Sequence, residues 1–278
     1  MIELGHRYTL NVIKTSNNGV YLDAENLGDV LLPLKFVSDK LSVGDCVEVF
    51  LYLDSEDRPV ASTQQSRVSV GEFAYLRAIQ TTPIGAFLDW GLDKDLLLPF
   101  SEQHKKIVEG HSYLVYVYLN KVDGRITASS KIDKYIDEEN NHDFKPKQAV
   151  DLIIANSTDL GYKAIINHSC WGLLYKAEVF QRLSFGQSVK GYIKNIRPDQ
   201  KIDLSLQGGQ ETRDNHSKVI QDYLIAQNGF AAVHDKSDPQ LIVELFAMSK
   251  SSFKKAIGGL YREGIVRIEK DGIYLLER

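Results

Sequence analysis

The sequence is poor in cysteine and has no long apolar run. Its two cysteines, Cys46 and Cys170, stand alone without Cys-x-x-Cys spacing. We therefore expect two reduced, partly buried thiols rather than a disulfide framework or a cysteine zinc site. No stretch approaches the roughly 18 apolar residues that span a membrane, and the first residues lack the basic-then-apolar layout of a secretion signal. These absences predict a cytoplasmic protein with no membrane partner.

Catalytic signatures are absent as well. The sequence contains no P-loop, no nucleophile elbow and no His-Glu-x-x-His motif, and its seven histidines are scattered. Acidic residues alternate in two predicted hairpin loops, around Asp54–Asp57 and Asp93–Asp95, where we expect them simply to face water. A metal-dependent nuclease needs carboxylates that converge on one point. We therefore expect no enzymatic activity, no cofactor and no bound metal.

The net charge of −4 conceals an uneven distribution along the chain. Residues 145–206 contain nine Lys and Arg against five Asp and Glu, and residues 249–278 contain seven against four. Residues 1–70 contain six against ten. A polyanion is attracted to the first two segments and repelled by the third.

One motif occurs three times, as NNGVYLDAENLGDVLLP, PIGAFLDWGLDKDLLLP and DLGYKAIINHSCWGLLY. Its glycine is followed after fourteen residues by Pro or Tyr and after a further eleven by a second glycine. The three sets are Gly19, Pro33 and Gly44; Gly85, Pro99 and Gly110; Gly161, Tyr175 and Gly186. Repetition at a fixed spacing indicates a chain built from repeated structural units.

Each repeat spans about 60 residues and reads as five short strands rich in β-branched and aromatic residues. In the first copy these are LNVIKTS, GVYLDA, VLLPL, CVEVFLYL and PVAST. A polar segment that ends in glycine separates the third and fourth strands. This pattern favours the OB fold, a small Greek-key barrel that binds oligonucleotides on its strand 2–3 face, over a solenoid.

The carboxyl-terminal segment changes to helical periodicity at Asp214. Asp238-Pro239 is a typical start for a second helix, and Ser249 can cap a third that runs to Gly264. The following IVRIEKDGIYLLE reads as a hairpin with Asp271-Gly272 as its turn. Three helices and a hairpin describe a winged helix.

The chain is therefore predicted to be mainly β with a C-terminal α+β module: three tandem OB-fold barrels followed by a winged helix-turn-helix domain. The barrels are expected at residues 1–68, 69–131 and 145–207, and the winged helix at 212–278. Residues 132–144 form an acidic linker, read as a spacer that lets the third repeat move, with a short helix as a compatible alternative.

These patterns resemble a known family. GAFLDW…LLLPFSE is similar to the RNA-binding OB repeat of the large ribosomal small-subunit protein called S-one. Three such repeats before a helical module, with MSKSSFKKAIGGLYREGIVRI as the most specific stretch, resemble the conserved virulence factor B family of bacterial RNA-binding regulators. The resemblance covers nearly the whole chain and implies post-transcriptional regulation of gene expression.

Strand alternation predicts which side chains face a ligand. Positions one and three after the motif glycine should line the barrel: Val20, Ala86, Tyr162, Leu22, Leu88 and Ala164. Position two points outward and carries Tyr21, Phe87 and Lys163. In the resembled family this outward residue is an aromatic that stacks on a base; packing against a neighbouring repeat is the alternative.

Repeats one and two depart from the resembled family. The family usually has an aromatic before the glycine, and often His on strand three. Here those positions hold Asn18, Ile84 and Leu160, and Pro33, Pro99 and Tyr175. Repeats one and two are therefore predicted to be weakened as RNA readers.

Repeat three combines cations with rings, which suits a flexible polyanion with stackable bases. The candidate RNA-binding residues in the repeats are Phe87, Tyr162, Lys163, His168, Trp171, Tyr175, Lys176, Lys190, Tyr192, Lys194, Arg197 and Lys201. The third helix adds Lys250, Lys254, Lys255 and Arg262 as phosphate contacts. It has few side chains suited to base edges.

The sequence thus predicts a non-enzymatic protein that binds single-stranded RNA with low sequence specificity, mainly through repeat three and the winged helix. Residues 145–278 alone should bind nearly as well as the full chain, and residues 1–131 poorly. Two alternatives remain open. One is a DNA-binding transcriptional regulator that uses the winged helix, and the other is an interaction scaffold for ribosome or RNA-decay components.

Overall fold

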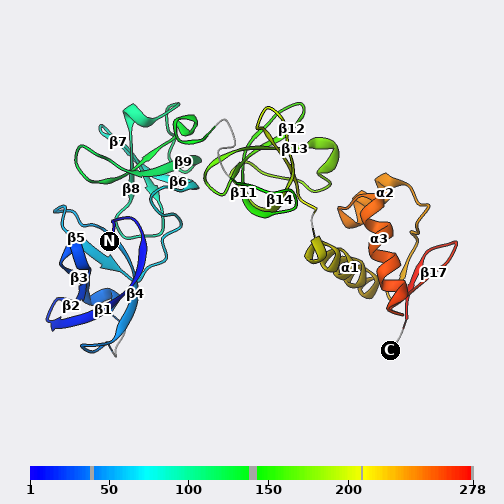
Figure 1. Ribbon diagram of the computed structural model, residues 1–278, viewed down its shortest axis with the longest axis horizontal. Coiled ribbons are helices and arrows are strands. Elements are labelled where there is room, and N and C mark those ends of the chain that lie inside the picture. Colours follow the sequence, from blue (N-terminus) through cyan, green and yellow to red (C-terminus); the bar gives the residue numbers. More distant parts are fainter. Residues whose placement is uncertain (38–40, 138–142, 208, 277–278) are drawn as a thin grey trace. The chain divides into compact units, whose positions relative to one another are not determined.

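The computed structural model describes residues 1–37, 41–137, 143–207 and 209–276, apart from the side chains of 209–214. It contains three closed five-stranded barrels, followed by helices and a small three-stranded sheet (Figure 1). The chain forms two compact units, Met1–Ile136 and Asp137–Arg278. The predicted fold class is confirmed.

The strands fall where the repeat predicts them. Barrel 1 comprises β1 (Arg7–Ser16), β2 (Gly19–Asp23), β3 (Asp29–Pro33), β4 (Cys46–Leu53) and β5 (Pro59–Ser62). Barrel 2 comprises β6 (Phe73–Thr82), β7 (Gly85–Asp89), β8 (Leu96–Pro99), β9 (Ser112–Leu119) and β10 (Ile126–Ser129). Barrel 3 comprises β11 (Ala149–Ser157), β12 (Gly161–Ile166), β13 (Cys170–Tyr175), β14 (Ser188–Ile196) and β15 (Ile202–Ser205).

All three barrels share one topology. The first strand pairs with the second and fourth, and a parallel pairing between the third and fifth closes the barrel. A short 3-10 turn follows each third strand, as in Leu34–Phe36, Phe100–Glu102 and Lys176–Glu178. Most positions predicted to line the barrels are buried: Val20, Leu22, Ala86, Leu88 and Ala164.

The motif glycine is required by a close approach of two backbones. A Cβ atom on Gly19, Gly85 or Gly161 would lie 2.1, 2.4 or 2.0 Å from the carbonyl oxygen of the residue before Pro33, Pro99 or Tyr175. No side chain fits at that distance. This backbone contact explains why the glycine and its spacing recur.

The position fourteen residues before the motif glycine holds Gly5, Gly71 and Lys147. Lys147 keeps the backbone conformation of the glycines that it replaces. Its φ is 73°, against 83° for Gly5 and 89° for Gly71. Its amide donates to the carbonyl of Ile193, as the amide of Gly71 donates to that of Val117. The third barrel therefore repeats the geometry of the others at this position without repeating the residue.

The carboxyl-terminal helices have the predicted caps. They are α1 (Gly209–Ala226), α2 (Pro239–Phe246) and α3 (Lys250–Arg262). The Asp238 carboxylate accepts a hydrogen bond from the Gln240 amide at 2.7 Å, and the Ser249 hydroxyl accepts one from the Ser252 amide at 3.0 Å. Ala247, between α2 and α3, is left-handed with a φ of 50°. The helix-turn-helix lies where it was expected.

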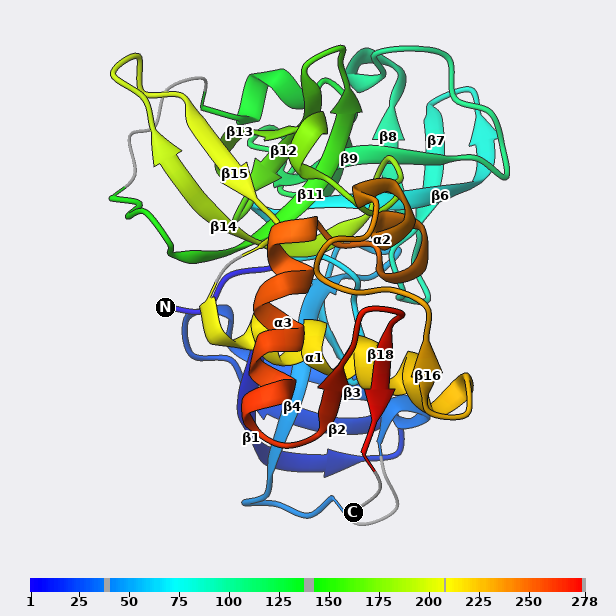
Figure 2. The ribbon, with the colours of Figure 1, turned by 90° about the vertical axis from the view of Figure 1, so that its right-hand side faces the viewer.

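Two features of this module differ from the prediction. α1 begins at Gly209 rather than Asp214. Its first turn is polar, so apolar periodicity could not reveal it. A short strand, β16 (Phe230–Ala231), joins the hairpin of β17 (Val266–Ile268) and β18 (Ile273–Leu275), as Figure 2 shows. Two residues are too few to give a strand pattern in the sequence.

The cysteine prediction is right for one thiol and wrong for the other. Cys170 is buried, and its burial raises the pKa of the thiol to about 11. Cys46 is exposed, because it starts β4 on the outer side of barrel 1, where its sulfur lies 3.0 Å from the Asn11 side-chain oxygen.

The linker is only partly described. A 3-10 turn, Ile132–Tyr135, supports the short-helix alternative, and Asp137 then pairs with Cys170 at the start of β13. Residues 138–142 lie outside the described residues, so the spacer remains a prediction. Among the described helices, none has the length and apolar content needed to cross a membrane.

Replacing Gly161 by alanine should destabilise the carboxyl-terminal unit by about 2–4 kcal/mol, because the new methyl group meets the Leu174 carbonyl oxygen. Thermal unfolding followed by circular dichroism measures the loss. The control is Gly258→Ala in α3, where nothing lies within 4 Å of the added methyl group. That change should stabilise by up to about 1 kcal/mol. Equal effects of the two substitutions would contradict the backbone-contact explanation.

Candidate nucleic-acid interface

The outward face of β12, β13 and β15 brings together most of the cations and rings predicted in repeat three. The register places Lys163 opposite Leu173, and Leu173 opposite Asp203. Trp171 and Tyr175 lie on the same face as Leu173, two residues to either side of it. We call this surface the barrel 3 face. It is the strand 2–3 face on which OB folds bind oligonucleotides.

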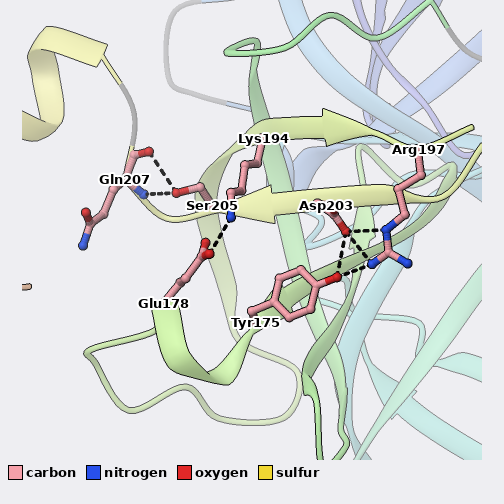
Figure 3. A network of polar contacts seen from close by, with 7 residues as sticks. All are labelled: Tyr175, Glu178, Lys194, Arg197, Asp203, Ser205 and Gln207. Carbon is pink, nitrogen blue, oxygen red and sulfur yellow. Dashed lines mark hydrogen bonds and ion pairs between the residues drawn. The ribbon is translucent and has the colours of Figure 1, made fainter.

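One arginine is fixed at the edge of the barrel 3 face, as Figure 3 shows. The Arg197 guanidinium donates to the Asp203 carboxylate from Nε at 2.8 Å and from Nη2 at 2.6 Å, and also to the Tyr175 hydroxyl. The Tyr175 hydroxyl donates to the same carboxylate oxygen at 3.2 Å. The hydrogen bond to Asp203 raises the pKa of Arg197. The network holds a permanent positive charge beside an aromatic ring.

A second cation lies over a ring on the same face. The Lys163 ammonium is 3.8 Å from the centroid of the Trp171 ring. Both residues line a cleft of about 590 Å³ together with Leu160, Leu173, Arg197 and Lys201. The cleft therefore combines apolar walls with three cations, an arrangement that suits a base and its phosphates.

Lys194 extends the barrel 3 face toward the turn after β13. Its ammonium pairs with the Glu178 carboxylate and lies 5.8 Å from the centroid of the Tyr175 ring (Figure 3). Beside it, the Ser205 hydroxyl donates to the Gln207 carbonyl at 2.9 Å and fixes the end of β15. The predicted residues that the structure brings together are Lys163, Trp171, Tyr175, Lys194, Arg197 and Lys201.

The remaining predicted residues of repeat three lie apart from this group. Tyr162 packs against the barrel core, as its inner position predicts, and does not join the outward face. His168 lies in the turn at the other end of the β12–β13 hairpin, with a φ of 56°. Lys190 and Tyr192 pair with β11, where the Lys190 ammonium contacts Asp151 at 2.7 Å. Lys176 begins the turn after β13.

The strand registers identify the equivalent residues in the other barrels. Pairs with the same relation to the motif glycine are Tyr21 and Leu31, Phe87 and Leu97, and Lys163 and Leu173. The position ten residues after that glycine holds Asp29, Asp95 and Trp171. Another equivalent position directly follows the fourth strand, where the backbone amide donates to a carbonyl on the far side of the next turn. It holds Asp54, Asn120 and Arg197. Only barrel 3 has a ring and a cation where the others have acids or an amide.

The equivalent face of barrel 2 is bordered by barrel 1. A cavity of about 220 Å³ beside Phe87 is lined partly by Tyr52 and Leu53 of barrel 1. The Lys94 ammonium donates to the carbonyls of Leu53 at 3.0 Å and Asp54 at 2.6 Å. Phe87, predicted to bind RNA, therefore lies where the neighbouring repeat packs, as the alternative interpretation proposed.

Further contacts fasten barrel 1 to barrel 2. The Arg125 guanidinium forms two hydrogen bonds with the Asp57 carboxylate, at 3.0 and 2.5 Å, and lowers the pKa of that carboxyl. The Phe50 and Trp90 rings meet edge to face, with centroids 5.6 Å apart. The loop acids predicted simply to face water are therefore partly used between the two barrels. Among the described residues, no cluster of His, Cys, Asp and Glu could hold a metal.

The basic side chains of α3 divide into two groups. The Lys250 ammonium donates to the Lys236 and Ser237 carbonyls at 3.2 and 2.8 Å, and so ties α3 to the segment before α2. Lys254 lies 3.9 Å from the Asp235 carboxylate. Lys255 and Arg262 are exposed. These two are the better placed for phosphate contact.

The sequence alone did not reveal Asp203 or Leu173 as parts of the face. Asp203 is an acid in a basic segment, and its side chain is only 13% exposed because it sits beneath Arg197. The spacing of ten residues from the motif glycine was a usable signal for Trp171, since it aligns this ring with Asp29 and Asp95. No spacing in the sequence indicated how β15 pairs with β13, so Asp203 could not be placed on the face.

Two families of known domains match parts of this chain. An S1 domain model matches residues 4–64, and a CvfB-like winged helix domain model matches residues 218–275. Both match binding domains rather than enzymes. The S1 and winged-helix domains indicate nucleic-acid binding.

Relatives cover most of the chain. "Uncharacterized protein YitL" of Bacillus subtilis is 27% identical over 97% of this chain and 93% of its own length. "Conserved virulence factor B" of Staphylococcus aureus strain N315 is 28% identical over 86% and 82%. A solved Streptococcus pneumoniae multidomain protein with nucleic acid binding domains is 22% identical, covers 98% of both chains and has a TM-score of 0.40. The resemblance to the conserved virulence factor B family is thus confirmed over most of the chain, from an amino-terminal S1 domain to a CvfB-like winged helix domain.

Proposed function

We propose that this protein is a non-enzymatic, cytoplasmic RNA-binding protein that acts in post-transcriptional regulation. It binds single-stranded RNA with low sequence specificity through barrel 3, at residues 145–207, and through the winged helix at 212–278. Barrels at 1–68 and 69–131 serve as scaffold, joined to the rest by a linker at 132–144. The observation that carries the proposal is the barrel 3 face, where Lys163, Arg197 and Lys201 surround an apolar cleft.

A single strand fits this face better than a duplex does. The bases of a single strand are free to stack on aromatic rings, whereas a duplex presents only its phosphates to such a surface. Trp171 and Tyr175 are rings on the outward face, beside cations that can reach a flexible backbone. A face built of rings and cations also reads no base edge, which accounts for low sequence specificity.

The winged helix has an auxiliary role in this proposal. A duplex reader inserts the third helix into the major groove and contacts base edges from its outer side. The exposed side of α3 offers Ser251, Lys254 and Lys255, followed by two glycines. Cations without base readers position a nucleic acid but do not specify its sequence.

Three cations of barrel 3 are already paired with acids of the same barrel. Lys194 contacts Glu178, Lys201 lies 3.5 Å from Asp199, and Arg197 is bonded to Asp203. RNA phosphates have to compete with these carboxylates, which lowers the affinity for any polyanion. Removing one carboxylate should therefore strengthen binding.

Changing Lys163, Lys194 and Lys201 together to Glu should weaken binding of a single-stranded RNA oligomer roughly 10- to 100-fold at fixed salt, because three phosphate partners become repulsive. Fluorescence anisotropy measures the affinity. The control makes the same charge change at Lys105, Lys106 and Lys121, which are exposed on barrel 2. Undiminished affinity of the folded triple variant would favour the scaffold alternative. Tighter binding of the unmodified chain to duplex DNA than to RNA would favour the DNA-binding regulator.

Glu178→Gln should raise RNA affinity about two- to fivefold at low salt, because it releases Lys194 for a phosphate. The salt dependence of the affinity should steepen by up to about 0.7 in its logarithmic slope, the contribution of one more phosphate contact on a single strand. Glu56→Gln is the matched control, since Glu56 pairs with Arg58 at 2.9 Å in barrel 1. An equal gain in both variants would mean that net charge alone is responsible.

A further inference from the structure

Barrel 3 has exchanged the chemistry of two positions on its outward face. Barrels 1 and 2 have a ring on the second strand, Tyr21 or Phe87, where barrel 3 has Lys163. They have an acid ten residues after the motif glycine, Asp29 or Asp95, where barrel 3 has Trp171. In barrel 3 the ring therefore lies on the third strand instead of the second, and a cation takes the position on the second strand.

The two exchanged residues touch. Lys163 lies opposite Leu173, and Trp171 lies opposite Ile165, so they are diagonal neighbours on the two strands. The Lys163 ammonium, 3.8 Å from the ring centroid, covers one face of the indole. The same ring forms part of the wall of the 590 Å³ cleft, beside Leu160, which is 68% exposed. In the protein alone, the place where a base would stack is occupied by a side chain that can move.

We propose that Trp171 is the residue on which barrel 3 stacks a base, and that the Lys163 ammonium is a displaceable cover of that ring. The incoming base takes the place of the ammonium over the indole, and the ammonium turns to an adjoining phosphate. Stacking of a base on an aromatic ring is worth more than an exposed cation–π contact, so the exchange favours the bound state. This inference rests on the proposed function, because it names the stacking residue of that same site.

The small number of tryptophans allows the displacement of Lys163 by a base to be followed by fluorescence. The sequence has only two tryptophans. The other, Trp90, is 3% exposed, and its indole N–H donates to the Lys94 carbonyl at 2.6 Å. Trp171 is the more accessible of the two and lies on the proposed site. Tryptophan fluorescence, excited where tyrosine does not absorb, comes from both rings, but only Trp171 lies where a ligand of the barrel 3 face would change it.

The experiment titrates the full chain with a single-stranded RNA oligomer and, separately, with inorganic polyphosphate, which has charge but no bases. We expect RNA to quench the tryptophan emission and polyphosphate to leave it nearly unchanged. The quench should disappear in Trp171→Phe, where only Trp90 emits. Quenching by both polyanions, or by neither while RNA binds, would overturn the inference and leave the proposed function standing. Failure of RNA to bind at all would overturn both.

Substitutions test the energetic role of the ring. Trp171→Ala should weaken RNA binding roughly 5- to 100-fold, the loss expected for one stacked base, while Trp171→Phe should retain most of the affinity. Lys163→Met should weaken binding but keep the quench, because it removes the cover and not the ring. Tyr21→Ala is the matched control: this ring occupies the Lys163 position in barrel 1 and has a lysine, Lys14, 5.6 Å from its centroid. A larger loss for Tyr21→Ala than for Trp171→Ala would contradict the exchange.

Discussion

The parallel pairing between the third and fifth strands closes each barrel, and it fixes which side chains meet on the outward face. Leu31 lies opposite Val60, Leu97 opposite Thr127, and Leu173 opposite Asp203. Because side chains alternate along a strand, a shift of one residue in this pairing would turn the face inside out. The motif glycine holds the neighbouring pair of strands in the matching register, since no side chain fits against the carbonyl opposite it. The ligand chemistry of each barrel thus depends on a backbone that is nearly invariant among the three.

The same frame has been put to two different uses. In barrels 1 and 2, loop residues such as Asp57, Lys94 and Arg125 bond one barrel to the other. The Phe50–Trp90 contact gives this pair an apolar centre. In barrel 3 the outward face instead carries rings and cations that surround a cleft. The uneven charge along the sequence corresponds to these two roles, since the acids that join barrels 1 and 2 also repel a polyanion.

Much of the fold followed from the sequence because its signals are local and repeated three times. The glycine spacing predicted the fifteen strands of the three barrels. Asp238 and Ser249 predicted two helix N-caps, which the structure confirms. The site was less accessible to such reasoning. Lys163 and Trp171 were named, but their contact depends on pairing across a hairpin, and Asp203 depends on a parallel pairing with β13. Tyr162 was named for its ring, although its alternation already assigned it to the inner face. The alternation within one strand predicts which face of the sheet a side chain lies on. Which side chains touch across two strands depends on the pairing register, which the sequence does not show.

The arginine at the edge of the barrel 3 face has a consequence for the thermodynamics of association. A free arginine side chain gives up about 2 kcal/mol of rotamer entropy when a ligand immobilises it. Arg197 is already immobilised by Asp203 and Tyr175 before any ligand arrives (Figure 3). The ordering cost has thus been met during folding, and the guanidinium can receive a phosphate on its remaining N–H groups with little further loss of freedom. A preorganised donor of this kind partly offsets the affinity that the internal carboxylates take away.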